Sequence, residues 1–117
     1  MNVEDLRYYC LSMGNDVEEK MPFGKFPGGA GVLAFYVKGH MFCYFDIDDF
    51  KVINVKCQPE RINELRASSN GMTNPNNLSA KHWIGMIPDI VNPSLAQELI
   101  LNSYNIVKEK YTPKRRR

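Results

Sequence analysis

The histidines and cysteines of this chain are the residues that could bind a metal or take part in catalysis. His40 and His82 are the two histidines, and neither stands in an HxxH, CxxC or paired-ligand spacing that favours a metal site. Cys57 and His82 would form a nucleophile and base pair if their strands adjoin, but nothing in the sequence orients the histidine. We therefore expect no metal, no cofactor and no catalysis.

Two further groups of residues could take part in acid–base catalysis or phosphate binding if they stood in a different structural setting. Asp46, Asp48 and Asp49 lie close together, but aspartates in a turn bond their own backbone, which explains the cluster without acid–base work. The glycine-rich run at residues 28–31 leads into a β-rich segment, whereas a phosphate-binding loop opens a helix. Both groups indicate turns and loops rather than an active site.

Positive charge is concentrated at the C-terminal end. Residues 108–117 hold six lysines and arginines against one glutamate, a net +5, so the rest of the chain carries −3 of the total of +2. A domain that binds DNA by neutralising phosphates is usually basic, and here only the tail is. We predict that any DNA affinity is mostly non-specific and comes from this end, including Lys114, Arg115, Arg116 and Arg117.

An aromatic residue beside cations marks a second candidate site. His82 and Trp83 are adjacent in the sequence. With Lys56 and Phe23 they could line a cleft for a small ligand or a protein segment. Structural alternatives stay open: Trp83 could fill the core between the sheet and the last helix, and Phe23 could be core as well. Lys56 could be a solvated sheet residue or a partner for Asp46 across two strands.

Three β-rich runs, at residues 32–38, 41–47 and 51–57, form the centre of the chain. Lys38-Gly39-His40 reads as a tight hairpin, because glycine takes a positive φ without steric cost. Strands joined this closely must be antiparallel. The sequence therefore predicts a three-stranded meander, to which residues 81–87 add a fourth antiparallel strand.

The alternation of side chains predicts which residues of the second strand share a face. Strict period-two alternation places Met41 with Cys43 and Phe45 on one face. It places Phe42 with Tyr44 on the other face.

Helical spacing of apolar residues predicts helices at residues 2–12, 59–67 and 93–110. The first and last carry apolar stripes suited to lying on a sheet. Residues 16–20 and 68–79 are expected to be polar connections. The predicted fold class is therefore α+β, an antiparallel sheet (meander) with helices packed against it.

Size and composition limit the possible organisation. The 117 residues suit one domain, which we place at residues 1–111, followed by a disordered basic tail at 112–117. The chain has neither a long apolar run nor a signal peptide, so we expect a cytoplasmic monomer with no membrane contact. The three cysteines, odd in number and set in apolar runs, are expected to be reduced and buried.

Six short motifs occur in order along most of the chain. They are Leu6-Arg7-Tyr8-Tyr9-Cys10, Pro22-Phe23-Gly24, Met41-Phe42, Lys56-Cys57-Gln58-Pro59-Glu60, Lys81-His82-Trp83-Ile84 and Ser103-Tyr104. Taken together they resemble the MmcQ/YjbR family of small bacterial proteins. The resemblance implies an α+β domain related to the frataxin-like (CyaY-like) fold.

The resemblance also implies DNA binding, because the family is described as contacting the duplex with a double-wing arrangement of hairpins. Where the family usually has a lysine before Met-Phe, this chain has His40, and Ala80 leaves only Lys81 as a cation before His-Trp. The candidate nucleic-acid contacts are Lys38, His40, Lys56, Lys81 and His82, together with the tail. The alternative function is a protein-interaction or ligand-binding module at the cleft described above.

Overall fold

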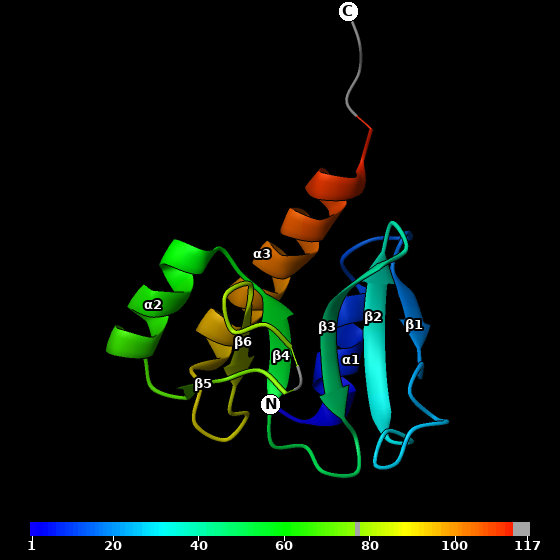
Figure 1. Cartoon of the computed structure of the whole chain (residues 1–117), viewed down its shortest axis with the longest axis horizontal. Helices are drawn as coiled ribbons and strands as arrows, with labels where there is room; N and C mark the ends of the chain where they lie inside the picture. Colours follow the sequence, from blue (N-terminus) through cyan, green and yellow to red (C-terminus); the bar gives the residue numbers. More distant parts are fainter. Residues whose placement is uncertain (77, 114–117) are drawn as a thin grey trace, which may run out of the picture.

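The computed structural model describes residues 1–76 and 78–113, which form three helices and a six-stranded antiparallel sheet (Figure 1). The helices are α1 (Val3–Leu11), α2 (Pro59–Ser68) and α3 (Pro93–Tyr111). The strands are β1 (Glu18–Lys20), β2 (Val32–Val37), β3 (His40–Asp46), β4 (Ile53–Lys56), β5 (Met72–Thr73) and β6 (Trp83–Met86). They lie in the order β1-β2-β3-β4-β6-β5, which confirms the α+β class.

One face of the sheet carries the core. Phe35, Phe45, Val55 and Ile84 are fully buried and belong to the same apolar cluster as the inner residues of α1 and α3. α3 crosses β2, β3 and β4, and α2 lies beside β5 and β6 (Figure 1). The packing of the first and last helices against the sheet, predicted from their apolar stripes, is confirmed.

Local sequence signals define two of the element boundaries. Asn2 caps α1, since its Oδ1 accepts a hydrogen bond from the N–H of Asp5 at 2.8 Å. Between β2 and β3 the backbone turns through Lys38 (φ 54°) and Gly39 (φ 77°). Two successive positive φ values define a two-residue hairpin turn of the kind that matches the twist of its strands. The predicted tight hairpin is confirmed.

A β-bulge changes which side chains of β3 share a face. Phe35 is paired with Cys43, whereas its neighbour Tyr36 is paired with Met41, so Phe42 is the extra residue. Phe42 is fully buried and packs edge-to-face against Tyr104 of α3, at 5.4 Å between ring centroids. Strict alternation groups Met41 with Cys43 and Phe45, and Phe42 with Tyr44, and the bulge shows that both groupings are wrong.

Two short strands lie in segments expected to be polar connections. β1 pairs its Glu18 with Tyr36, and β5 pairs its Met72 with Met86. Both strands lie at the edges of the sheet. A charged or very short edge strand disfavours pairing with another chain. β4 also begins at Ile53, two residues later than predicted, since Lys51 and Val52 follow the bend at residues 47–49 without pairing in the sheet.

The end of α3 leads toward the tail. Thr112 is the C-cap residue of α3 and already has extended backbone, and Pro113 follows it. Lys114, Arg115, Arg116 and Arg117, for which a disordered tail was predicted, lie outside the described residues. Within residues 1–76 and 78–113, no helix has the length and apolar character needed to cross a membrane.

Candidate functional site

The register of the sheet brings the candidate cations of three strands to one end. Cys43 of β3 is paired with Val55 of β4, and Val55 with Ile84 of β6. The start of β3, the end of β4 and the start of β6 therefore lie side by side, and the N–H of Cys57 donates to the carbonyl of His82 at 2.9 Å. We call this the basic end; its candidate cations are Lys38, His40, Lys56, Lys81 and His82.

The C-terminal turns of α3 reach the same end of the molecule (Figure 1). The rings of His40 and Tyr111 are stacked, with 3.4 Å between centroids and 8° between planes. The stack joins the β2–β3 hairpin to the last turn of α3, which carries Lys108 and Lys110. The hairpin and the basic C-terminal segment are separate candidates in the sequence. In the structure they are neighbours, in contact at His40 and Tyr111.

The aspartates of the β3–β4 turn lie at the opposite end of the sheet. β3 extends from His40 to Asp46, six residue steps and about 20 Å. Asp46 is paired with Val32, whereas Lys56 lies one step beyond Val55, which faces Cys43. The suggested pairing of Lys56 with Asp46 is therefore wrong, because the register separates the two residues along the strands.

Some carboxylates do share the basic end. Asp16 forms an ion pair with Lys108, with 2.9 Å between Oδ2 and Nζ, and accepts a hydrogen bond from the Tyr104 hydroxyl at 2.6 Å. The Tyr104 bond is the main cause of a lowered pKa for Asp16, and the contact with Lys108 adds to it. Glu18 lies nearby in β1, opposite Tyr36. Among the described residues, the remaining positive charge at this end therefore comes mainly from Lys38, Lys56, Lys81 and Lys110.

Trp83 lies on the face of the sheet opposite α3. It is paired with Lys56, while the next pair, Val55 and Ile84, points into the core. The indole is partly exposed and packs edge-to-face against Tyr44, at 6.0 Å between ring centroids. The interpretation of Trp83 as a filler between sheet and last helix is wrong, since alternation along β6 assigns that place to Ile84.

Cys57 and His82 meet through backbone atoms and not as a reacting pair. The Cys57 side chain is buried, and burial raises the pKa of its thiol. His82 is exposed, and its described hydrogen bonds involve its backbone, including an N–H donated to the carbonyl of Ser79 at 3.2 Å. A thiol with a raised pKa is a poor nucleophile. All three cysteines are free and buried, which confirms the prediction made for them.

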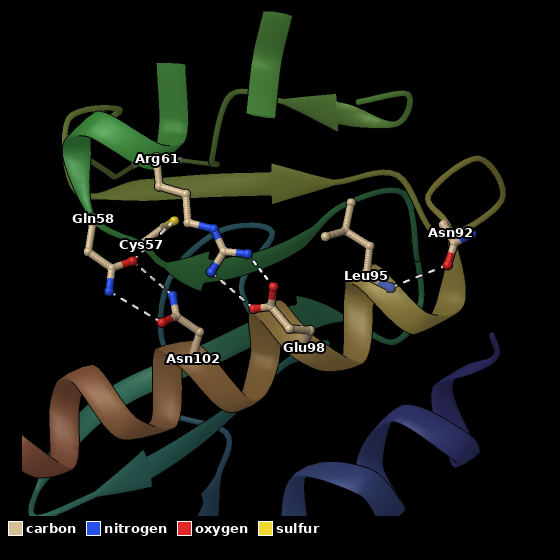
Figure 2. A network of polar contacts seen from close by, with 7 residues as sticks. All are labelled: Cys57, Gln58, Arg61, Asn92, Leu95, Glu98 and Asn102. Carbon is tan, nitrogen blue, oxygen red and sulfur yellow. Dashed lines mark hydrogen bonds and ion pairs between the residues drawn. The ribbon is translucent and has the colours of Figure 1, made fainter. Parts of the chain in front are cut away.

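Polar side chains at the β4–α2 junction bond one another (Figure 2). The amides of Gln58 and Asn102 exchange two hydrogen bonds, at 3.0 and 3.3 Å. Arg61 of α2 forms a bidentate ion pair with Glu98 of α3, with 3.0 Å between Nη1 and Oε2. The Cys57 thiol donates to Oε1 of Gln58 at 3.8 Å. The network ties α2 to α3, so the residues after Lys56 stabilise the fold.

The other face of the sheet contains an open cavity of about 740 Å³. The carbonyl of Asn76 accepts from the Tyr44 hydroxyl, and the N–H of Asn76 donates to Oδ1 of the fully buried Asn54 at 2.8 Å. These bonds hold the loop after β5 against the sheet. We call this the aromatic cavity; its lining residues are Phe23, Phe26, Pro27, Gly28, Gly29, Val32, Met41, Tyr44, Asp46, Asn54, Pro75, Asn76 and Leu78.

The cleft predicted from the sequence is only partly the one that the structure contains. Phe23 lines the aromatic cavity, whereas Lys56, His82 and Trp83 are not among its lining residues. Trp83 and Lys56 share the same face of the sheet, and Trp83 touches Tyr44 of the lining. Sequence reasoning missed Asn54, although a buried asparagine inside an apolar strand is a signal that something polar must bond it.

The fold and these two sites define a small α+β domain: helices back one face of the sheet, an aromatic cavity occupies the other, and cations collect at one end. The chain belongs to the YjbR family, whose model matches residues 14–106. The resemblance drawn from six short motifs is confirmed.

Two solved structures are similar to this chain. A Deinococcus radiodurans protein with a DUF419 domain is 30% identical, with a TM-score of 0.82 over 97% of this chain and 83% of that one. A Pseudomonas syringae protein, 21% identical, shares the fold with a TM-score of 0.75 over 92% of this chain and 99% of its own. No curated protein matches the chain. The relation to the frataxin-like fold stays a prediction.

Proposed function

We propose that this protein binds DNA without catalysis, through phosphate contacts at the basic end and its tail. The observation that carries the proposal is the stacking of His40 on Tyr111. This contact joins the β2–β3 hairpin and the end of α3 into one continuous surface. A phosphate backbone lying across this surface would meet cations from both elements at once.

The separation of charge supports this assignment. The net charge of −3 outside residues 108–117 argues against DNA binding only if it is spread evenly. Three of its carboxylates, Asp46, Asp48 and Asp49, lie in the turn at the far end of β3. They are about two Debye lengths from the basic end at physiological salt, where exposed charges are largely screened.

The test is a salt series of duplex binding, measured by fluorescence anisotropy from about 50 to about 200 mM salt. We compare the full chain with a chain ending at Pro113, which keeps the His40–Tyr111 stack and removes four cations. The slope of log K against log salt should flatten by up to about 0.9 for each lost phosphate contact. Lys38→Ala should flatten it by about one contact.

Lys51→Ala is the matched control, since Lys51 is exposed at the opposite end of the sheet and pairs only loosely with Asp49 at 3.6 Å. It should leave the slope unchanged. Equal effects of Lys38→Ala and Lys51→Ala would contradict the basic end as the interface. Sequence-specific binding that survives in the chain ending at Pro113 would instead favour the hairpin acting as a wing in a groove.

A second candidate function is a small-ligand module, which the size of the aromatic cavity favours. Pockets of about 300–1,000 Å³ that combine apolar walls with a few placed polar groups are typical of small-molecule sites. The two functions use different surfaces, so one chain could have both.

A further inference from the structure

We propose that the aromatic cavity binds a small organic cation, an ammonium group carried on an apolar or aromatic body. The proposal is independent of DNA binding, because it concerns the face of the sheet away from the helices and uses none of the cations of the basic end.

The charge of the lining points to a cation. Asp46 is the one charged side chain among the lining residues, all of which lie in the described part of the chain. Its Oδ1 accepts hydrogen bonds from the N–H groups of Asp48 at 2.9 Å and Asp49 at 3.2 Å. These bonds fix the carboxylate in the turn, and no described residue bonds its Oδ2. An ammonium group in the cavity would find one oriented anion and no competing lysine or arginine.

The walls suit the rest of such a ligand. Phe23 and Phe26 pack edge-to-face, with 6.3 Å between ring centroids, and Phe26 is largely exposed although it is a large aromatic. Tyr44 forms the floor from β3. An ammonium group within about 6 Å of a ring face is attracted by the ring quadrupole, and aromatic rings around such a group are a recurring way to recognise it.

The polar groups of the floor are already occupied. The Tyr44 hydroxyl and the Asn54 side chain both bond the backbone of Asn76, and Nδ2 of Asn54 donates to the carbonyl of Tyr44 at 3.2 Å. Burial raises the pKa of the Tyr44 hydroxyl to about 12, so this group stays neutral at physiological pH. The floor therefore offers few free hydrogen bonds to a neutral polar ligand. Charge and aromatic contact remain as the means of recognition.

The cavity wall formed by residues 23–29 is built from consecutive turns. The N–H of Phe26 donates to the carbonyl of Phe23, and the N–H of Gly29 to the carbonyl of Phe26, both at 3.0 Å. A Cβ on Gly29 would lie 2.3 Å from the Phe23 carbonyl oxygen, so only glycine fits this contact. The segment is thus held in shape by its own bonds, and a ligand would not have to order it.

The test uses three probes of similar shape and different charge: benzylamine, benzyl alcohol and benzoate. Each is titrated into ¹⁵N-labelled full-length protein while amide chemical shifts are followed. We expect benzylamine to perturb residues of the cavity lining and to bind about 3- to 30-fold more tightly than benzyl alcohol, the fold-change of a cation–π contact. Benzoate should bind more weakly than both.

Asp46→Asn is the decisive variant, because the asparagine keeps an oxygen for the Asp48 and Asp49 N–H groups and removes the charge. It should weaken benzylamine binding toward the level of benzyl alcohol, with the aromatic contact remaining, and leave benzyl alcohol binding unchanged. Asp49→Asn is the matched control in the same turn, outside the lining and paired with Lys51, and should leave binding unchanged. Unperturbed spectra elsewhere show that each variant is folded.

Several outcomes would overturn the proposal. They are equal binding of benzylamine and benzyl alcohol, equal losses in Asp46→Asn and Asp49→Asn, and shifts confined to residues outside the cavity. Phe23→Leu gives a second check on the wall, and unchanged benzylamine affinity in that variant would exclude the aromatic contact.

Discussion

At the scale of single residues, the serine in the middle of α3 has the most specific role. Ser103 is fully buried, accepts a hydrogen bond from the N–H of Lys56 at 2.8 Å and donates to the carbonyl of Phe42 at 2.5 Å. It bonds β3 at its bulge and β4 at its last residue, where the two strands no longer pair with each other. One hydroxyl thus satisfies two backbone groups that the ladder leaves free.

Ser103→Ala should lower the free energy of unfolding by about 1–3 kcal/mol, because it leaves a buried donor and a buried acceptor without partners. Urea titration of the purified variant measures the loss. Ser94→Ala, at an exposed position in the first turn of the same helix, should change stability by less than about 0.5 kcal/mol. A loss of equal size in both variants would mean that the buried bonds of Ser103 are not responsible, since alanine has the higher helix propensity at both positions.

Asp16 makes stability depend on pH. Its pKa is lowered in the folded protein by the Tyr104 hydroxyl and by Lys108. A group with a depressed folded pKa contributes stability that is fully present above its unfolded pKa, about 3.9, and lost as pH falls through the folded value. Asp16→Asn should therefore cost stability at pH 7 and cost progressively less as the pH drops below about 4.

Urea midpoints at several pH values, read for the wild-type protein and Asp16→Asn, measure this convergence. Asp49→Asn serves as a control, because Asp49 is exposed and its ion pair with Lys51 is long, at 3.6 Å. If the difference between wild type and Asp16→Asn stays constant down to pH 2, the Tyr104 and Lys108 contacts do not stabilise the ionised carboxylate.

At the scale of elements, β6 shows how a strand divides its residues between two environments. Ile84 is fully buried in the core, whereas Trp83 on the opposite face is only partly covered, by Tyr44. Ile84→Ala should lower the free energy of unfolding by about 2–5 kcal/mol, and Trp83→Ala by about 1–2 kcal/mol despite the larger side chain removed. Denaturant titrations of both variants decide, and a larger loss for Trp83→Ala would contradict the assigned faces.

The elements that could be predicted from sequence are those with strong local signals. The β2–β3 hairpin has glycine in its turn, and α1 and α3 combine a capping asparagine with an apolar stripe. β1 could not be predicted, because Glu-Glu-Lys has no strand preference and becomes a strand only by pairing with the edge of β2. The bulge at Phe42 leaves no mark in the alternation and depends on α3 packing above it.

The candidate sites were less predictable than the fold, because they depend on contacts between segments that are distant in the sequence. The cations of the basic end were identified one by one, but their proximity depends on the β3–β4–β6 register, which local patterns do not set. The aromatic cavity joins the segment from Phe23 to Gly29, strand β3 and the lining residues Pro75, Asn76 and Leu78, which are far apart in the chain. Phe23 is a candidate in the sequence, whereas Asp46 is interpreted there as a turn residue or as a cross-strand partner of Lys56.

At the scale of the whole molecule, the sheet consists of two ribbons joined along a short seam. β2 and β3 face each other at six residue pairs and β4 and β6 at four, but β3 and β4 at only two, Cys43–Val55 and Tyr44–Asn54. α3 crosses this seam and packs on β2, β3 and β4. The helix therefore adds to the short ladder in holding the two ribbons together.

This seam has a consequence for how the native protein opens. Structures unfold locally in cooperative units, and a boundary with few backbone bonds is where such units separate. Native-state hydrogen exchange should resolve two of them, with the amides of β4 and β6 opening at a lower free energy than those of β2 and β3. In Ser103→Ala the Lys56 amide should lose protection first, because its acceptor is the serine hydroxyl. Exchange of all these strands at one common free energy would mean that the two ribbons unfold only together.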